Sequence, residues 1–450
     1  MERLSGLDAV FLAVETPNNP MNIGSLAVFE GPVPENEAIH HVLANRIATI
    51  PRCRQRVHDP FGSFVRPIWI DDMNFDPDAH IDHISLRERS FHALENFVSE
   101  IVATPLDRCR PLWHVWIVDG LEDGNWAILA IVHHCLVDGI AGNDLLSAVL
   151  SAEPKSQTKY SVSPEPSSIE ILLFTLRSTA TSCMIHLRGV WRSLTHPLTS
   201  WRRVRDITRS AKGLWWRQSH LPISLVGPIG TGRRWTSLKI SLDDIQLIQE
   251  KFGGTVNDIV VAAVTSGFRD LLLKRGESVE NRTLTAMVPV SLRQQSERGK
   301  TGNRVANIHA RLPLSDEDPI TRLRVVQNHL QDLKYSHDAE ATGFVMNIGN
   351  YVPRPIADRL ARAIVQRQRS VETVITNVPG PQSSVHLEAS LLIGAYPIAP
   401  IAGQVRITVA VWSYHGHLYI GVTADQSSVP DIETLARGIS GGFETLIGII

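Results

Sequence analysis

Three features are scarce in this sequence, namely an excess of one charge, cysteine and long apolar runs, and each scarcity excludes a class of protein. Lysine and arginine number 44 against 46 aspartate and glutamate, which gives a net charge of −2 over 450 residues. A chain this close to neutral lacks the basic excess that binds nucleic acid. The 4 cysteines are widely spaced and form no Cys-x-x-Cys pair, which predicts a reducing compartment with neither a disulfide framework nor a zinc site built from cysteines.

No apolar run approaches the roughly 18 residues that a membrane-spanning helix requires. The N-terminal stretch MERLSGLDAVFLAVETPNN has no basic region, and Glu15 ends its short apolar part, so no signal peptide is predicted. The chain is 43% hydrophobic and 20% charged, which is typical of a globular protein. We therefore expect a folded cytoplasmic protein of two or three domains.

The composition changes once, near the middle of the chain. Residues 151–168 are rich in serine and proline, which predicts a linker. From Ile169 to Leu194 apolar residues recur every three or four positions, as on one stripe of a helix, and the segment up to Arg217 is rich in arginine and tryptophan. The predicted parts are an N-terminal domain (1–154), a linker with a basic amphipathic helical connector (155–225) and a C-terminal domain (226–450).

Both halves mix strands and helices, so the predicted fold class is α+β. Residues 24–31 and 112–121 have strand composition, and residues 37–50 a helical pattern. In the second half the apolar spacing from Val256 to Leu272 predicts an amphipathic helix with Thr255 as N-cap. Residues 404–425 predict a strand hairpin with Gly416 in the turn.

The stretch HHCLVDG carries the strongest functional signal. His133 and His134 end an apolar strand-like run, and Asp138 and Gly139 follow. Side chains alternate between the faces of a strand, so the two imidazoles should diverge, which disfavours a shared metal. No G-x-S-x-G elbow is present for serine hydrolysis, and Cys135 is interpreted as a small apolar filler.

A single imidazole acting as general base remains, since its ordinary pKa near 6.5 lets it accept a proton at neutral pH. Gly139 suits a tight turn and Asp138 can hold that turn. The pattern by itself leaves an alternative open, in which both histidines are hydrogen-bonded core residues at a strand end. The adjacent pair His40 and His41 lies in a helical pattern without a following Asp-Gly, and is expected to be structural.

HHCLVDG fits the HHxxxDG motif of the CoA-dependent acyltransferase superfamily, which includes chloramphenicol acetyltransferase. Further segments resemble the bacterial wax ester synthase/diacylglycerol acyltransferase family along essentially the whole chain. They are the N-terminal LSGLDAVFLAVETPNNPMNIGSLAVFEG, the PLW segment Pro111, Leu112 and Trp113, the pair Asn257 and Asp258, MVPVSLR, GNRVAN, and TNVPGP at Thr376 to Pro381.

The resemblance implies two chloramphenicol-acetyltransferase-like α/β sandwich domains with a tunnel between them. His134 would be the base, taking a hydroxyl proton while that oxygen attacks the thioester, without an acyl-enzyme. Asp138 would be structural and pair with an arginine, for which Arg293 is the candidate. Asn257 would orient the site or the oxyanion, although helix capping explains Asn257 and Asp258 equally well. Pro111 to Trp113 would pack beside the tunnel.

The substrates implied by the resemblance are acyl-CoA and either diacylglycerol or a long-chain alcohol, with no cofactor besides the acyl-CoA co-substrate. A lipid acceptor implies peripheral association with the inner face of the plasma membrane or with lipid droplets. The connector (Ile169 to Arg217) suits such a surface through its apolar stripe, arginines and tryptophans. Packing of the same stripe between the domains is the alternative.

Three other functions are compatible with parts of the pattern. His133 and Asp138 also fit the H-x4-D spacing of glycerol-phosphate acyltransferases. That family has a shorter catalytic domain and usually membrane helices, and the paired histidine and the later blocks fit the wax ester synthase/diacylglycerol acyltransferase family better. A condensation-type or polyketide-associated acyltransferase would take its acyl group from a carrier protein, and no carrier domain is evident. An inactive paralogue that coats lipid droplets is the non-enzymatic alternative.

Overall fold

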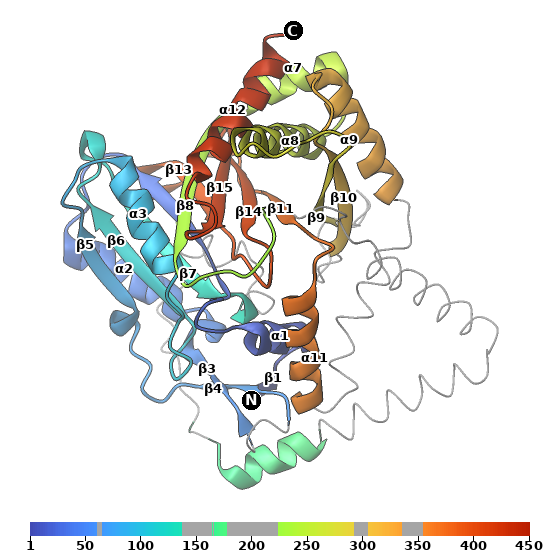
Figure 1. The fold of residues 1–450 in the computed structure, drawn as a ribbon. Coiled ribbons are helices and arrows are strands. Elements are labelled where there is room, and N and C mark those ends of the chain that lie inside the picture. Colours follow the sequence, from blue (N-terminus) through green and yellow to red (C-terminus); the bar gives the residue numbers. More distant parts are fainter. Residues whose placement is uncertain (61–64, 137–163, 165, 178–223, 292–304, 335–353) are drawn as a thin grey trace.

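Two six-stranded sheets, each drawn mainly from one half of the sequence, form the framework of the protein (Figure 1). The computed structural model describes residues 1–60, 65–136, 164, 166–177, 224–291, 305–334 and 354–450. Among these residues no helix is long and apolar enough to span a bilayer. The mixed arrangement of strands and helices confirms the predicted α+β class.

The N-terminal sheet has the strand order β12-β13-β2-β7-β6-β5. Its central strand β7 contributes Ile128 and Val132 to one core and Leu129 and Ile131 to another, because both faces of the sheet are covered. Helix α2 packs in the first core and α3 in the second. The bounds are β2 (Asn22–Phe29), β5 (Ile81–Ser85), β6 (Trp113–Asp119), β7 (Trp126–His133), β12 (His386–Leu387), β13 (Ser390–Ile398), α2 (Asn36–Ala48) and α3 (Phe91–Val102).

The C-terminal sheet has the strand order β10-β9-β11-β14-β15-β8, and four of the described helices cover one of its faces. Helices α8 and α12 cross closely at Gly267, where an added Cβ would lie 2.8 Å from the carbonyl oxygen of Leu435. The bounds are β8 (Arg233–Ser241), β9 (Thr283–Ser291), β10 (Val305–Pro313), β11 (Thr373–Pro379), β14 (Ile407–Tyr414), β15 (His417–Asp425), α7 (Leu242–Phe252), α8 (Val256–Lys274), α9 (Pro319–Lys334) and α12 (Ile432–Ile447).

The two halves are interlocked. Strands β12 and β13 come from the C-terminal half but complete the N-terminal sheet, in which β13 pairs with β2. Tyr414 and Tyr419 also pack into the N-terminal core, and the Glu95 carboxylate accepts hydrogen bonds from Thr236 and from the Ser237 amide. The domain boundaries drawn from the sequence remain predictions, and they did not include this crossing hairpin.

The other described elements lie around the N-terminal sheet. A small sheet has the order β1-β4-β3, and α1 lies beside α11 (Figure 1). A helix at residues 168–177 begins the predicted connector, and the remainder of the connector lies outside the described residues. The bounds are β1 (Glu2–Arg3), β3 (Gln55–His58), β4 (Ile68–Asp71), α1 (Gly6–Val14), α11 (Arg354–Arg367) and the 3-10 turns η1 (Pro51–Arg54), η3 (Pro77–His80), η4 (Glu122–Gly124) and η5 (His134–Leu136).

Most of the elements predicted from periodicity are confirmed. Strands β2 and β6 and helices α2 and α8 lie where their patterns placed them. Thr255 caps α8 in a full capping box with Asp258. The C-terminal hairpin of β14 and β15 turns at Gly416, whose φ of +73° favours glycine.

Candidate active site

The two histidines lie where β7 ends and the short turn η5 begins. Neighbouring backbone groups fix this point from both sides, because the His133 amide donates to the Leu112 carbonyl (3.0 Å) and the His134 amide donates to the Met21 carbonyl (2.8 Å). Leu112 and Met21 directly precede strands β6 and β2, which pair with β7 on its two sides. The start of the turn is therefore held by both neighbours of β7.

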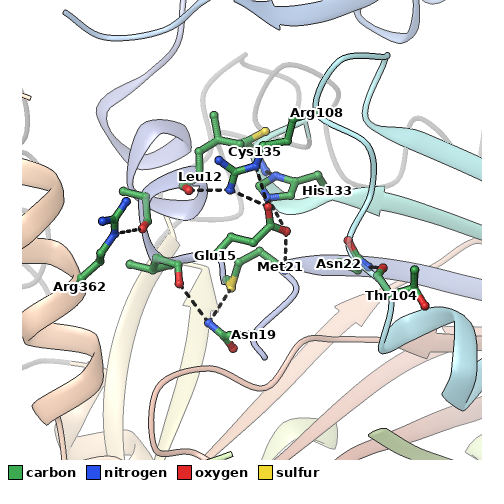
Figure 2. Close-up of polar contacts among 12 residues, drawn as sticks. Leu12, Glu15, Asn19, Met21, Asn22, Thr104, Arg108, His133, Cys135 and Arg362 are labelled. Carbon is green, nitrogen blue, oxygen red and sulfur yellow. Dashed lines mark hydrogen bonds and ion pairs between the residues drawn. The ribbon is translucent and has the colours of Figure 1, made fainter. Parts of the chain in front are cut away.

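The side chain of His133 is fully buried and makes two polar contacts (Figure 2). Its Nδ1 accepts a hydrogen bond from the Cys135 amide at 3.1 Å. Its Nε2 lies 3.3 Å from Oε1 of Glu15, in contact but without well-aligned hydrogen-bond geometry. The His133 ring thus lies between a carboxylate and the backbone of the turn. Because it is buried there, it has a structural role and is not open to substrate.

His134 is partly exposed and stacks on Phe11, with ring centroids 3.8 Å apart and an interplanar angle of 26°. Its Nδ1 is buried without a hydrogen-bond partner of good geometry among the described residues. The pKa of His134 is lowered to about 4, mainly by burial, against a smaller opposing effect of its own backbone and with a minor contribution from His133. His134 is therefore neutral at neutral pH, which is the state a base requires.

Helix α1 supplies three side chains to this turn, one from each successive turn of the helix. Ser5 caps α1 and bonds Asp8, and Phe11 and the C-cap residue Glu15 follow at spacings of three and four. These spacings place all three on one helix face, and α1 contacts η5 directly. Burial is the main cause that raises the pKa of Cys135, and the Asp8 and Glu15 carboxylates raise it further.

Glu15 is almost completely buried, with 5% of its side chain exposed. Burial alone would raise its pKa, but His133 and then Arg108 outweigh burial and lower it to about 2. Arg108 donates to Oε2 through Nε (2.9 Å) and Nη2 (2.6 Å). The carboxylate is thus ionised beneath the turn, in contact with a cation and an imidazole (Figure 2).

The predicted site residues fall into three groups. His133 and His134 come together with the PLW segment, since the Leu112 carbonyl binds the His133 amide. Leu112 and Trp113 are buried, and the Trp113 indole donates to the Cys53 carbonyl, so this segment packs beside the turn, and its place beside a tunnel remains a prediction. Asp138, Gly139 and Arg293 lie outside the described residues.

The structure does not bring Asn257 and Asp258 to the histidines. They begin α8, which lies with α9 and α12 over the C-terminal sheet, whereas the turn η5 contacts α1 in the other half (Figure 1). The Asp258 carboxylate accepts the Thr255 amide at 2.7 Å. Capping accounts for Asp258 in this arrangement, and a role in orienting the reaction remains a prediction.

Cys135 has the environment predicted for a filler. It is 1% exposed, and burial raises its pKa far above that of a free thiol, so the nucleophilic thiolate does not form. Within the described part of the chain no three histidine, cysteine, aspartate or glutamate side chains are grouped as metal ligands. Among the described residues of the turn, the neutral imidazole of His134 is partly exposed, whereas the side chains of His133 and Cys135 are buried.

Sequence reasoning missed Phe11, Glu15 and Arg108. Glu15 was interpreted only as the residue that ends an apolar stretch. The available signal was the spacing of Asp8, Phe11 and Glu15, which marks one face of a helix.

A cleft of about 300 Å³ lies between the chain that follows Glu15 and α11, and it is lined in part by Asn19 and Arg362.

The two-sheet fold is shared with acyltransferases of known structure. Trichothecene 15-O-acetyltransferase from Fusarium sporotrichioides superposes with a TM-score of 0.63 at 11% identity, over 99% of this chain and 94% of that one. A wax ester synthase/diacylglycerol acyltransferase from Marinobacter aquaeolei VT8 superposes with a TM-score of 0.70 at 22% identity, over 99% and 98%. The common architecture confirms the predicted fold.

Sequence comparison identifies the family. The model of the wax ester synthase/diacylglycerol acyltransferase catalytic domain matches residues 4–260, and that of the family's C-terminal domain matches residues 301–447. "Probable diacylglycerol O-acyltransferase tgs1" of Mycobacterium tuberculosis is 37% identical over 100% of this chain and 96% of its own length. The chain belongs to the wax ester synthase/diacylglycerol acyltransferase family, and it is an acyl-CoA-dependent acyltransferase.

Proposed function

We propose that the protein transfers a long-chain acyl group from acyl-CoA to the hydroxyl of diacylglycerol, giving triacylglycerol, or to a long-chain alcohol, giving a wax ester. The observation that carries the proposal is the imidazole of His134, which is partly exposed, stacked on Phe11 and neutral. The acyl group moves directly and needs no cofactor besides acyl-CoA. Diacylglycerol is the leading acceptor, because the 37% identical relative is named for it.

The reaction needs one group that can accept a proton and return it. His134 takes the proton of the acceptor hydroxyl as that oxygen attacks the thioester carbonyl carbon. The carbon–sulfur bond then breaks as the carbonyl re-forms, and the departing CoA sulfur takes the proton from the imidazolium. Ester and free CoA result, and the base is regenerated. A general base of this kind contributes typically about 10²–10⁴-fold.

The acceptors are lipids, so the protein must reach a membrane or droplet surface. At the described start of the connector, Ile171 packs against Ile68 and Ile70 of β4. The same helix exposes four large apolar side chains to solvent: Ile169, Leu172, Leu173 and Leu176. We propose that this face and the basic, tryptophan-rich residues that follow in sequence bind the inner face of the plasma membrane or a lipid droplet.

The catalytic proposal is tested by CoA release from palmitoyl-CoA, with dioleoylglycerol or hexadecanol as acceptor. His134→Ala should reduce turnover by at least about 100-fold with an unchanged melting temperature. The matched control is His41→Ala, since His41 also belongs to an adjacent pair but is exposed on α2. Near-normal turnover of His134→Ala would refute His134 as the base, and product identification by chromatography distinguishes the two acceptors.

The surface proposal is tested by cosedimentation with vesicles of phosphatidylglycerol and phosphatidylcholine. Replacing Leu173 and Leu176 with serine should weaken binding, and binding should fall as salt is raised because each basic residue near an anionic surface adds about 1 kcal/mol. Leu247→Ser is the control, as Leu247 is equally apolar and 46% exposed on α7. Binding that neither salt nor the double variant changes would indicate that the connector packs between the domains.

A further inference from the structure

Glu15 contacts the catalytic turn by two separate routes. Its Oε1 lies 3.3 Å from Nε2 of His133, and it also accepts a hydrogen bond from the Met21 amide at 3.2 Å. His133 and Met21 each form a second hydrogen bond, His133 with the Cys135 amide and Met21 with the His134 amide. The carboxylate therefore connects the end of β7 with the residue that precedes β2, at the point where these two paired strands reach the turn (Figure 2).

The first route runs through the ring of His133. Because Nδ1 accepts the Cys135 amide proton, Nδ1 carries no hydrogen, and the ring proton must be on Nε2, which faces Glu15. A carboxylate cannot donate, so it favours a hydrogen on the nitrogen nearest to it. Glu15 thereby selects the tautomer that leaves Nδ1 free to hold the peptide on the C-terminal side of His134.

The second route runs through Met21. Its amide donates to Glu15 Oε1, and its carbonyl accepts the amide of His134 at 2.8 Å. The amide of His134 and the amide that follows it are both fixed by groups that contact the same carboxylate oxygen. Since two consecutive peptide units set the direction of the side chain between them, the position of the His134 imidazole depends on Glu15.

We infer that Glu15, acting through His133 and Met21, is a positioning residue that aims the His134 imidazole at the acceptor hydroxyl. Arg108 completes the arrangement, since it is the cation that permits a carboxylate at this depth. The inference rests on the proposed role of His134 as base. It also assigns His133 a definite task, which is to transmit the position of a carboxylate to a backbone amide.

The sharpest test separates the two nitrogens of His133. In His133→Asn the amide oxygen can replace Nδ1 as acceptor for Cys135 but does not reach Glu15. In His133→Gln the amide nitrogen can replace Nε2 as donor to Glu15, while the acceptor for Cys135 is lost. In the CoA-release assay, kcat should be highest for the wild type, lower for His133→Asn and lowest for His133→Gln. KM for palmitoyl-CoA should stay nearly constant, because a misaligned base slows the chemical step.

Glu15→Gln keeps an acceptor oxygen but can also present an amide N–H to His133, so kcat should fall by about 10-fold or more. Glu100→Gln is the matched control, because Glu100 is an exposed acid of α3 that is absent from this network. Melting temperatures are measured for every variant. A loss of kcat that merely follows melting temperature, with Asn no better than Gln at position 133, would overturn the inference.

A readout independent of activity is nitrogen NMR of protein labelled with ¹⁵N-histidine. The signal that disappears in His133→Asn should be that of a neutral ring with its hydrogen on Nε2, and it should shift or broaden in Glu15→Gln. A hydrogen on Nδ1 would overturn the inference even if the enzyme is active. An active His134→Ala would instead refute the proposed function, so the two failures are distinguishable.

Discussion

Replacing Phe11 with alanine should change the pH at which the enzyme loses activity. Phe11 covers one face of the His134 ring at a centroid distance of 3.8 Å. Burial is the main cause that lowers the pKa of His134 from 6.5 to about 4. A difference of this size corresponds to about 3 kcal/mol in favour of the neutral imidazole. Without the phenyl ring water can solvate the imidazolium, so we expect the pKa to rise toward 6.5.

The neutral imidazole is the active form, so activity is lost as pH falls through the pKa of His134. The wild type should keep its turnover as pH decreases through 6.5 and lose it only near pH 4. Phe11→Ala should lose turnover at a higher pH, by about one unit or more. Stability should also fall as pH falls. Below pH 6.5 the histidine of the unfolded chain binds a proton while buried His134 does not, so the free energy of unfolding decreases as pH is lowered from 6.5 to 4.

The assay is kcat for CoA release from pH 8 to about 4.5, over which the wild type should lose little turnover while Phe11→Ala shows the acidic limb that reports the base. Activity after return to neutral pH excludes irreversible unfolding. Phe97→Ala is the control, since Phe97 is also a partly buried phenylalanine but contacts Trp116 on the other face of the sheet. An acidic limb near pH 6.5 in the wild type, unchanged by Phe11→Ala, would refute burial as the cause.

Three further outcomes are expected. Iodoacetamide should alkylate exposed Cys109 and spare Cys135, whose pKa is raised by burial, and Cys135→Ala should remain active; rapid labelling of Cys135, seen by peptide mass spectrometry, would contradict this. Thr255→Ala removes the cap of α8 and should lower the free energy of unfolding by about 1 kcal/mol in urea titrations without changing kcat. Asp138→Asn should lower melting temperature together with activity, and a variant that melts like the wild type but is inactive would assign Asp138 a direct catalytic role.

The predictions from sequence that proved correct concern local pattern. Alternation along β7 places Val132 and Leu129 in different cores, as a strand pattern predicts, whereas His134 already belongs to the turn η5. The capping box of α8 and the hairpin turn at Gly416 depend on residues within a few positions of each other. Such features are encoded over a short stretch of chain, so one sequence is enough to find them.

The missed features depend on distant partners. Strand β13 completes the N-terminal sheet by pairing with β2, more than 360 residues earlier in the chain. Its alternation predicts a strand but does not determine which sheet receives it, because every half-buried strand has a similar pattern. In the same way, the periodicity of α1 indicates a buried face but does not identify η5 as the surface that this face contacts.

Glu15 shows how physical chemistry could help to predict such distant contacts from the sequence. A carboxylate that follows an apolar helical face either turns to water or is buried with a partner, because an unpaired buried charge costs several kcal/mol. Glu15 continues the face of Asp8 and Phe11, which favours burial and therefore requires a cation or donors nearby. Composition cannot single out Arg108 among the 44 basic residues, but the requirement itself follows from the helix geometry. The adjacent histidines then explain why a charged Glu15 is buried at this place. Only one of the two can face the substrate, and the other contacts the carboxylate.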